Sequence, residues 1–341
     1  MSKVVYLLGA GASFGTRENG IGSPIITGLP IVCEICSELE NMANLLASLS
    51  LNDKYLEECK QKIVKDFQDL KNQSAGTTID SYARELWLQK DMPGFSRVEL
   101  LLTIFFIFEQ IVHKPDGRYK SFLSKVAQKD IVYDALNPSP EIGILSWNYD
   151  NQIELAYRQF FADNYLYIRK RLGFYDVKDY EQKQIFQKYC KIIKLNGTAN
   201  FTREEDWLKS SNNNTIDETV LKIILKRYDE CMQNGTCYGM VRLNFAWDDR
   251  WSKDMLTNKI PQLVHDAQTL VVIGYTFPDY NRGIDRIILD NIPNLKTIYI
   301  QDIHPKRIQD NITAVIPEDK LAGIKINPRD DVEQFYLPPE L

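Results

Sequence analysis

The sequence predicts an α/β fold, an open parallel β-sheet with helices on both faces and a large helical insertion after the first strand. Three observations predict it. Short, continuous apolar runs, typical of buried parallel strands, occur at residues 4–8 and return after residue 143. Helical patterns separate the later runs, and this alternation is typical of a Rossmann-like sheet. Between the first run and the others, residues 36–136 carry helical patterns only.

The elements follow in order along the chain. Residues 4–8 form the first strand, and a helix is expected from Gly28-Leu29-Pro30 to about Leu49, with proline in its first turn. Further helices are expected at residues 54–69, 79–89, 97–112 and 119–135. Later strands are expected at residues 143–147, 191–195, 239–245, 270–273 and 297–300, separated by helices at 151–161, 215–233, 251–267 and 280–291. The expected domains are a sheet core at residues 1–35 and 137–341 and a helical insertion or lid at 36–136.

Composition limits the classes of function. The 341 residues are 44% hydrophobic and 26% charged, as in globular proteins. A net charge of −5 gives no general attraction to nucleic acid or to anionic membranes. The longest apolar stretch, Leu100 to Phe108, is shorter than the roughly 20 residues of a membrane span, so a buried helix is expected there. The first residues lack the apolar core of a signal peptide, which predicts a cytoplasmic protein.

The cysteines do not predict a metal site. Cys33 and Cys36 form one C-x-x-C pair, but a structural zinc site needs a second pair or suitably spaced histidines. Neither is present in the sequence. We therefore expect no bound metal.

The run Gly9-Ala10-Gly11-Ala12-Ser13 follows the first strand and has the features of a phosphate loop. Glycines let backbone amides approach a pyrophosphate, and a following helix N-terminus would add positive potential. The dehydrogenase pattern G-x-G-x-x-G does not fit, because Phe14 stands at the third glycine position and glycine follows only at Gly15. The alternative is an ordinary glycine turn.

Three more motifs lie at expected strand ends, where such sheets bind ligands. Asn148 and Asp150 follow one strand and are suited to sugar hydroxyls or to positive charge at an anomeric carbon, although Asp150 could equally cap a helix. Asn196-Gly197 follows the next strand, and alone it would predict only a turn. Gly274, Tyr275 and Thr276 follow the next-to-last expected strand, and Asp302 follows the last one, placed for ribose or adenine.

In order and spacing, these motifs resemble the sirtuin superfamily. The resemblance rests on Gly9 to Ser13, Asn148 to Asp150, Lys194 to Gly197 and Ile273 to Pro278, and covers residues 1–35, 140–200 and 265–310. It is closest to the bacterial sirtuin-like NAD hydrolases of antiphage defence. The protein deacylases' proline-aspartate-phenylalanine-arginine segment and their paired C-x-x-C zinc ribbon are both missing here.

The resemblance implies hydrolysis of NAD to ADP-ribose and nicotinamide by an NAD-depleting effector. It also implies a homo-oligomer, with a separate sensor or ATPase as partner. Phosphates would lie on the glycine loop, the nicotinamide ribose beside Asn148 and Asp150, and adenosine near Asp302. The implied NAD-binding residues are Gly9, Gly11, Ala12, Ser13, Phe14, Asn148, Asp150, Gly274, Tyr275, Thr276 and Asp302.

One position departs from the family. The histidine expected before Gly197 is Asn196, and His113, His265 and His304 lie in no matching motif. Asparagine hydrogen-bonds a hydroxyl but accepts no proton near neutral pH, and loss of a general base typically lowers a rate by about 10²–10⁴. Two functions remain: an impaired NAD glycohydrolase, in which Asp150 is an alternative base, or a non-catalytic NAD or ADP-ribose sensor or regulatory subunit.

Overall fold

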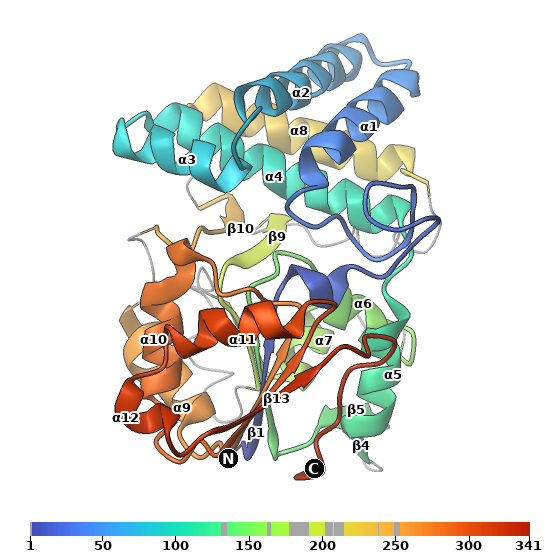
Figure 1. Cartoon of the computed structure of the whole chain (residues 1–341). Helices are drawn as coiled ribbons and strands as arrows, with labels where there is room; N and C mark the ends of the chain where they lie inside the picture. Colours follow the sequence, from blue (N-terminus) through green and yellow to red (C-terminus); the bar gives the residue numbers. More distant parts are fainter. Residues whose placement is uncertain are drawn as a thin grey trace.

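The fold is built on a seven-stranded sheet in which all strands are parallel. A computed structural model describes residues 2–130, 135–161, 165–176, 191–201, 207, 215–237, 239–248 and 253–341. Across the sheet the strands run in the order β13 (Lys325–Arg329), β12 (Thr297–Gln301), β11 (Thr269–Ile273), β1 (Val4–Leu8), β6 (Ile142–Ser146), β8 (Ile192–Lys194) and β7 (Phe174–Asp176). The predicted open parallel, Rossmann-like sheet is therefore confirmed, with β1 at its centre (Figure 1).

Helices cover both faces of this sheet because its central strands are apolar on both sides. Val5 and Leu7 of β1 pack into one core, whereas Val4, Tyr6 and Leu8 pack into the other. The first core is completed by α9 (Ile260–Val264), α10 (Arg282–Asp290) and α11 (Pro305–Thr313), and the second by α5 (Gly117–Val126), α6 (Gln152–Arg158) and α7 (Tyr165–Leu172). Figure 1 shows α9, α10 and α11 on one side of the sheet and α5, α6 and α7 on the other.

A separate helical layer lies over the end of the sheet where the motifs are found (Figure 1). It consists of α1 (Ile35–Ser48), α2 (Lys54–Gln73), α3 (Ile79–Leu88), α4 (Met92–Val112) and α8 (Glu218–Asn234). One hydrophobic core joins residues 39–111 to residues 199–245, so this layer combines two stretches of the chain. The short antiparallel strands β9 (Gly197–Phe201) and β10 (Val241–Leu243) belong to the same core and lie between α4 and the sheet.

Side-chain caps explain where several of these helices begin. Asp53, Thr78, Asp91 and Asp217 each precede a helix and accept a hydrogen bond from a backbone amide in its first turn. Such caps satisfy donors that the helix leaves unpaired and typically stabilise it by about 1 kcal/mol. α4 is buried along nearly its whole length, as expected for the apolar run at 100–108. Within the described parts of the chain, no helix has both the length and the apolarity needed to cross a membrane.

Most predicted elements are confirmed, and a few are wrong. Residues 28–34 are not helical: residues 28–31 are irregular and residues 32–34 form a turn that leads into α1. The buried Arg17 guanidinium holds this segment, because it donates to the Leu29 carbonyl and pairs with Glu34. The helix expected at 119–135 ends at Val126, and the chain continues as β4 (Ala127–Asp130), which pairs with β5 (Ala135–Pro138). The strand at 239–245 exists as β10, but it pairs with β9 outside the parallel sheet. The helix expected at 251–267 would begin at residues 251 and 252, which lie outside the described residues, and its described part includes α9.

Candidate functional site

The four motifs meet at one edge of the sheet because they follow four adjacent strands. Leu8 at the end of β1 is in register with Ile273 of β11 and with Ser146 of β6, and Ser146 is in register with Lys194 of β8. From β1 the chain builds β6 and β8 on one side and later β11 and β12 on the other. This reversal is a topological switch point, where open α/β sheets bind their ligands.

The glycine loop is fixed to the neighbouring strand by its own backbone. Gly9 N donates to Ile273 O at 3.0 Å, and Gly11 N donates to Gly274 O at 3.0 Å. The loop then makes one 3-10 turn, Ala10–Ser13, and continues into the short strand β2 (Thr16–Arg17). No long helix follows the loop, so the positive potential expected from a helix N-terminus is small here. The amides of Gly9 and Gly11 already have carbonyl partners, so a phosphate would have to share them.

The glycine loop after β1 packs directly against the loop after β11, and this contact requires glycine at Gly9, Gly11 and Gly274. A Cβ on Gly274 would lie 2.4 Å from the Gly11 Cα, and a Cβ on Gly9 would lie 2.6 Å from the Gly274 carbonyl oxygen. Gly274 also has φ +57°, in the left-handed region that disfavours other residues. Close packing between two loops therefore accounts for glycine at these positions, with or without a nucleotide.

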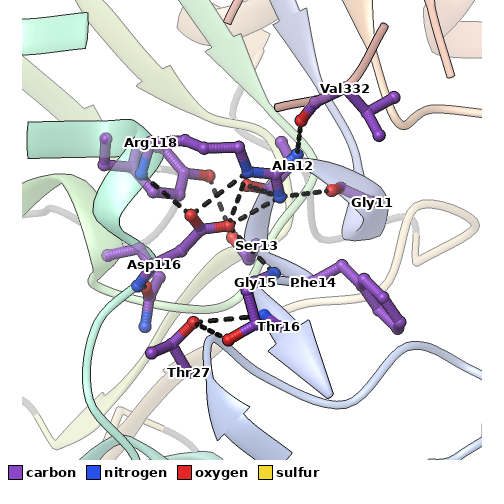
Figure 2. Close-up of polar contacts among 12 residues, drawn as sticks. Gly11, Ala12, Ser13, Phe14, Gly15, Thr16, Thr27, Asp116, Arg118 and Val332 are labelled. Atoms are coloured by element: carbon purple, nitrogen blue, oxygen red, sulfur yellow. Dashed lines mark hydrogen bonds and ion pairs between the residues drawn. The ribbon is translucent and has the colours of Figure 1, made fainter. Parts of the chain in front are cut away.

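Asp116 and Arg118, at the start of α5, clamp the glycine loop from the other side (Figure 2). Nη2 of Arg118 donates to the carbonyls of Gly11 at 3.0 Å and Ala12 at 3.2 Å. The Asp116 carboxylate accepts from Gly15 N at 2.9 Å and pairs with Arg118 at 2.6 Å. Neither residue is predicted as a site residue from the sequence. The only local signal was the helix-starting Asp116-Gly117, which does not indicate the distant loop that it holds.

Asn148 holds the same loop from the end of β6. Its Nδ2 donates to Gly9 O at 2.9 Å and to Ser13 Oγ at 3.0 Å. Ser13 Oγ also lies 2.9 Å from the hydroxyl of Tyr119, and burial raises the pKa of that hydroxyl well above its usual value. The hydroxyl is therefore neutral at physiological pH. Asn148 and Ser13 were both predicted as site residues, and the structure brings them into direct contact.

Asp150 is engaged with the protein rather than directed at an open space. Its Oδ1 accepts from Gln152 N at 3.0 Å, but the N-cap of α6 is Asn151, one residue after the position at which the sequence offered a cap. The buried ammonium of Lys194 lies 3.9 Å from the same oxygen and donates to the Asp150 carbonyl. Asp150 therefore holds the first residue of α6 and balances a buried positive charge.

Asn196 carries the one predicted site atom that is buried without a hydrogen bond. Its Nδ2 donates to Trp147 O at 2.9 Å, whereas its Oδ1 has no hydrogen-bond partner among the described residues. The side chain is 8% exposed. Asn244, which follows β10, donates its backbone amide to Asn196 O at 2.9 Å, and the Oδ1 of Asn244 is also buried without a partner in the described chain. Asn244 was not predicted, because it lies inside the strand expected at 239–245, whereas β10 ends at Leu243.

Asp285 is a buried acid behind the ends of β6 and β11, and it was not predicted from the sequence. The Trp147 ring stacks on that of Tyr275 with centroids 5.8 Å apart, and the Tyr275 hydroxyl donates to Asp285 at 2.8 Å. Burial raises the pKa of Asp285 to about 8, against the lowering effect of hydrogen bonds from Tyr275 and Trp147. Tyr275 therefore packs behind the loop, and Asp285 is largely protonated at neutral pH.

The remaining predicted residues lie around the edge of this region. Phe14 packs its ring under the Arg17 guanidinium, which is 4.1 Å from the ring centroid. Thr276 is exposed, and its carbonyl accepts from Asn311 at 2.8 Å. Asp302 is half-buried, and its carboxylate accepts from His304 N at 2.8 Å before α11. Among the described contacts, no histidine is hydrogen-bonded to Asn148, Asp150 or Asn196.

Comparison of the chain with protein-family models, with curated proteins and with solved structures gives no match.

Proposed function

We propose that this chain binds NAD at the carboxyl ends of β1, β6, β8 and β11, in the manner of sirtuin-like NAD glycohydrolases, with hydrolysis impaired by Asn196. The observation that carries the proposal is the unpartnered, buried Oδ1 of Asn196 at a topological switch point. Leaving a buried acceptor without a hydrogen bond destabilises a protein by roughly 1–3 kcal/mol. A ribose hydroxyl that donates to this oxygen would remove that penalty on binding.

The residues around Asn196 favour binding over turnover. Hydrolysis joins the oxygen of water to the anomeric carbon of the nicotinamide ribose, breaks the carbon–nitrogen bond, and releases nicotinamide with the electron pair. The water must lose a proton, and the amide of Asn196 does not accept one. Asp150 is a poor substitute, because its carboxylate already accepts from Gln152 N and faces Lys194.

The same observations support a second candidate, a non-catalytic sensor or regulatory subunit that binds NAD or ADP-ribose. In that function Asn196 would remain a ligand contact and need no general base. A role in antiphage defence, a homo-oligomer, and activation by a separate sensor or ATPase remain predictions from the sequence resemblance.

The test measures binding and turnover separately. NAD is titrated into the native chain and into Asn196→His by calorimetry, and nicotinamide release is followed for both. We expect both proteins to bind NAD and Asn196→His to release nicotinamide about 10² times faster or more. The control is Asn258→His, because Asn258 is exposed and its side chain donates to Asp254.

The outcomes separate the candidates. Failure of the native chain and of Asn196→His to bind NAD contradicts the proposal as a whole. Binding by both proteins without turnover in either favours the sensor. A gain of turnover in Asn258→His equal to that in Asn196→His would show that the position of the histidine is irrelevant and would remove the argument from Asn196.

A further inference from the structure

Three potential metal ligands gather where the helical layer returns to the sheet. Glu38 lies on α1, Glu109 lies on the last turn of α4, and His113 ends α4. One ligand atom from each lies within 4.8 Å of the other two. These residues have no part in the NAD site proposed above.

The Glu109 carboxylate is the clearest sign of a ligand. Glu109 is 1% exposed, and its Oε2 has no hydrogen-bond partner within the described residues. Burial raises the pKa of this carboxyl. The same Oε2 lies 3.4 Å from Nε2 of His113, which is longer than the usual N–H···O hydrogen bond of about 2.9 Å. The buried carboxylate oxygen therefore faces the imidazole nitrogen, which opposes the rise in its pKa, at a distance longer than a normal hydrogen bond.

The distance fits two ligands of one metal ion. Zinc binds imidazole nitrogen and carboxylate oxygen at about 2.0–2.2 Å in tetrahedral geometry, which places two ligand atoms about 3.4 Å apart. The Glu38 ligand atom lies within 4.8 Å of the other two, and this side chain is half-buried, so water can reach a fourth position. The Glu38 carboxylate accepts from Asn41 Nδ2 at 3.2 Å, an outer contact of the kind that orients metal-binding carboxylates.

The charges around the cluster are compatible with a divalent cation. Two carboxylates and a neutral imidazole carry two negative charges, which a divalent ion balances. Arg17 slightly lowers the pKa of Glu109, but its guanidinium is already paired with Glu34 at 2.7 Å. Imidazole with carboxylates suits zinc and other first-row transition ions, whereas magnesium and calcium prefer oxygen ligands only.

We propose that Glu38, Glu109 and His113 bind one divalent transition-metal ion of the zinc class. The ion would join the first turn of α1 to the end of α4. Lys114 follows His113 and accepts a backbone hydrogen bond from Gly28 at 2.9 Å, and a Cβ on Gly28 would lie 2.5 Å from the Ser13 carbonyl. The metal would therefore stabilise the helical layer close to Gly28 and Lys114, where the chain packs on the glycine loop.

The probe is zinc chloride, added to the full chain after chelator treatment and dialysis at pH 7.5. Bound metal is counted by elemental analysis, affinity is measured by calorimetry, and the melting temperature is recorded with and without zinc. We expect one zinc per chain, a higher melting temperature with zinc, and about 100-fold weaker binding or more in His113→Ala and in Glu38→Gln. Glu38→Gln changes a half-buried surface residue, so it keeps the test valid if His113→Ala fails to fold.

The matched control is His265→Ala. His265 is exposed and lies 2.9 Å from the Asp266 carboxylate, so it offers a histidine–carboxylate pair that has no third ligand among the described residues. Its removal should leave zinc affinity within about twofold of the native value. The proposal is overturned if the native chain takes up no stoichiometric zinc, or if uptake survives both Glu38→Gln and His113→Ala.

Discussion

Replacing Gly274 by alanine tests the contact between the two glycine loops. The substitution adds a Cβ that would lie 2.4 Å from the Gly11 Cα and 2.5 Å from the Ala12 nitrogen, so the backbone must move. Gly274 also has φ +57°, where an L-residue is disfavoured by roughly 1–2 kcal/mol. Forcing extra volume into a packed site typically destabilises by another 1–3 kcal/mol, or roughly 2–5 kcal/mol in all. Urea unfolding, followed by circular dichroism, measures this loss.

Gly235→Ala separates the two causes. Gly235 ends α8 with φ +65°, close to that of Gly274, but a Cβ there has no atom within 4 Å. This control should lose only the conformational part, roughly 1–2 kcal/mol. The reasoning is refuted if Gly274→Ala loses no more free energy of unfolding than Gly235→Ala at an unchanged denaturant slope.

Three other substitutions test the groups around the loop. Asp285 has a folded pKa of about 8, so between about pH 4 and pH 8 the folded state keeps a proton that the unfolded state loses, and the free energy of unfolding falls as pH rises. Asp285→Asn removes this loss, so in urea unfolding it should raise the free energy of unfolding by up to about 5 kcal/mol at pH 8 and by little near pH 4. Arg118→Met leaves the Asp116 carboxylate buried without its cation and should destabilise by roughly 3–5 kcal/mol, against at most about 1 kcal/mol for Arg282→Met, which breaks an exposed pair. Asn148→Ala removes two hydrogen bonds to the glycine loop, so it should lower the free energy of unfolding by roughly 1–3 kcal/mol and speed amide hydrogen exchange across residues 9–15. Unchanged exchange in these residues would mean that Asn148 does not hold the loop.

The central strands were predictable because each is encoded locally. Residues 4–8 form β1 as expected, since a short apolar run between polar segments has few other ways to be buried. The edge strand β13 was not predicted: its sequence Lys-Ile-Asn-Pro-Arg is mostly polar, and it becomes a strand only by pairing with β12. Burial of the Arg17–Glu34 pair likewise overrides the helical pattern at residues 28–34.

The candidate site was predictable in its positions and much less so in its contacts. The strand-end rule placed Gly9, Asn148, Asn196 and Gly274 at one edge, because parallel strands end together. What each side chain touches depends on residues far away in the chain. The Arg118 clamp, the buried acid behind the loop and the free oxygen of Asn196 all follow from packing between distant segments, which no local pattern encodes.

The central place of β1 also bears on how the chain reaches its folded state. β1 pairs with residues 142–146 on one side and with residues 269–273 on the other, so its second edge stays open until most of the chain has been synthesised. Exposed apolar strand edges promote association between chains. A ribosome-bound chain that ends before residue 269 should therefore depend on chaperones, and release of β1 from them should coincide with the emergence of β11.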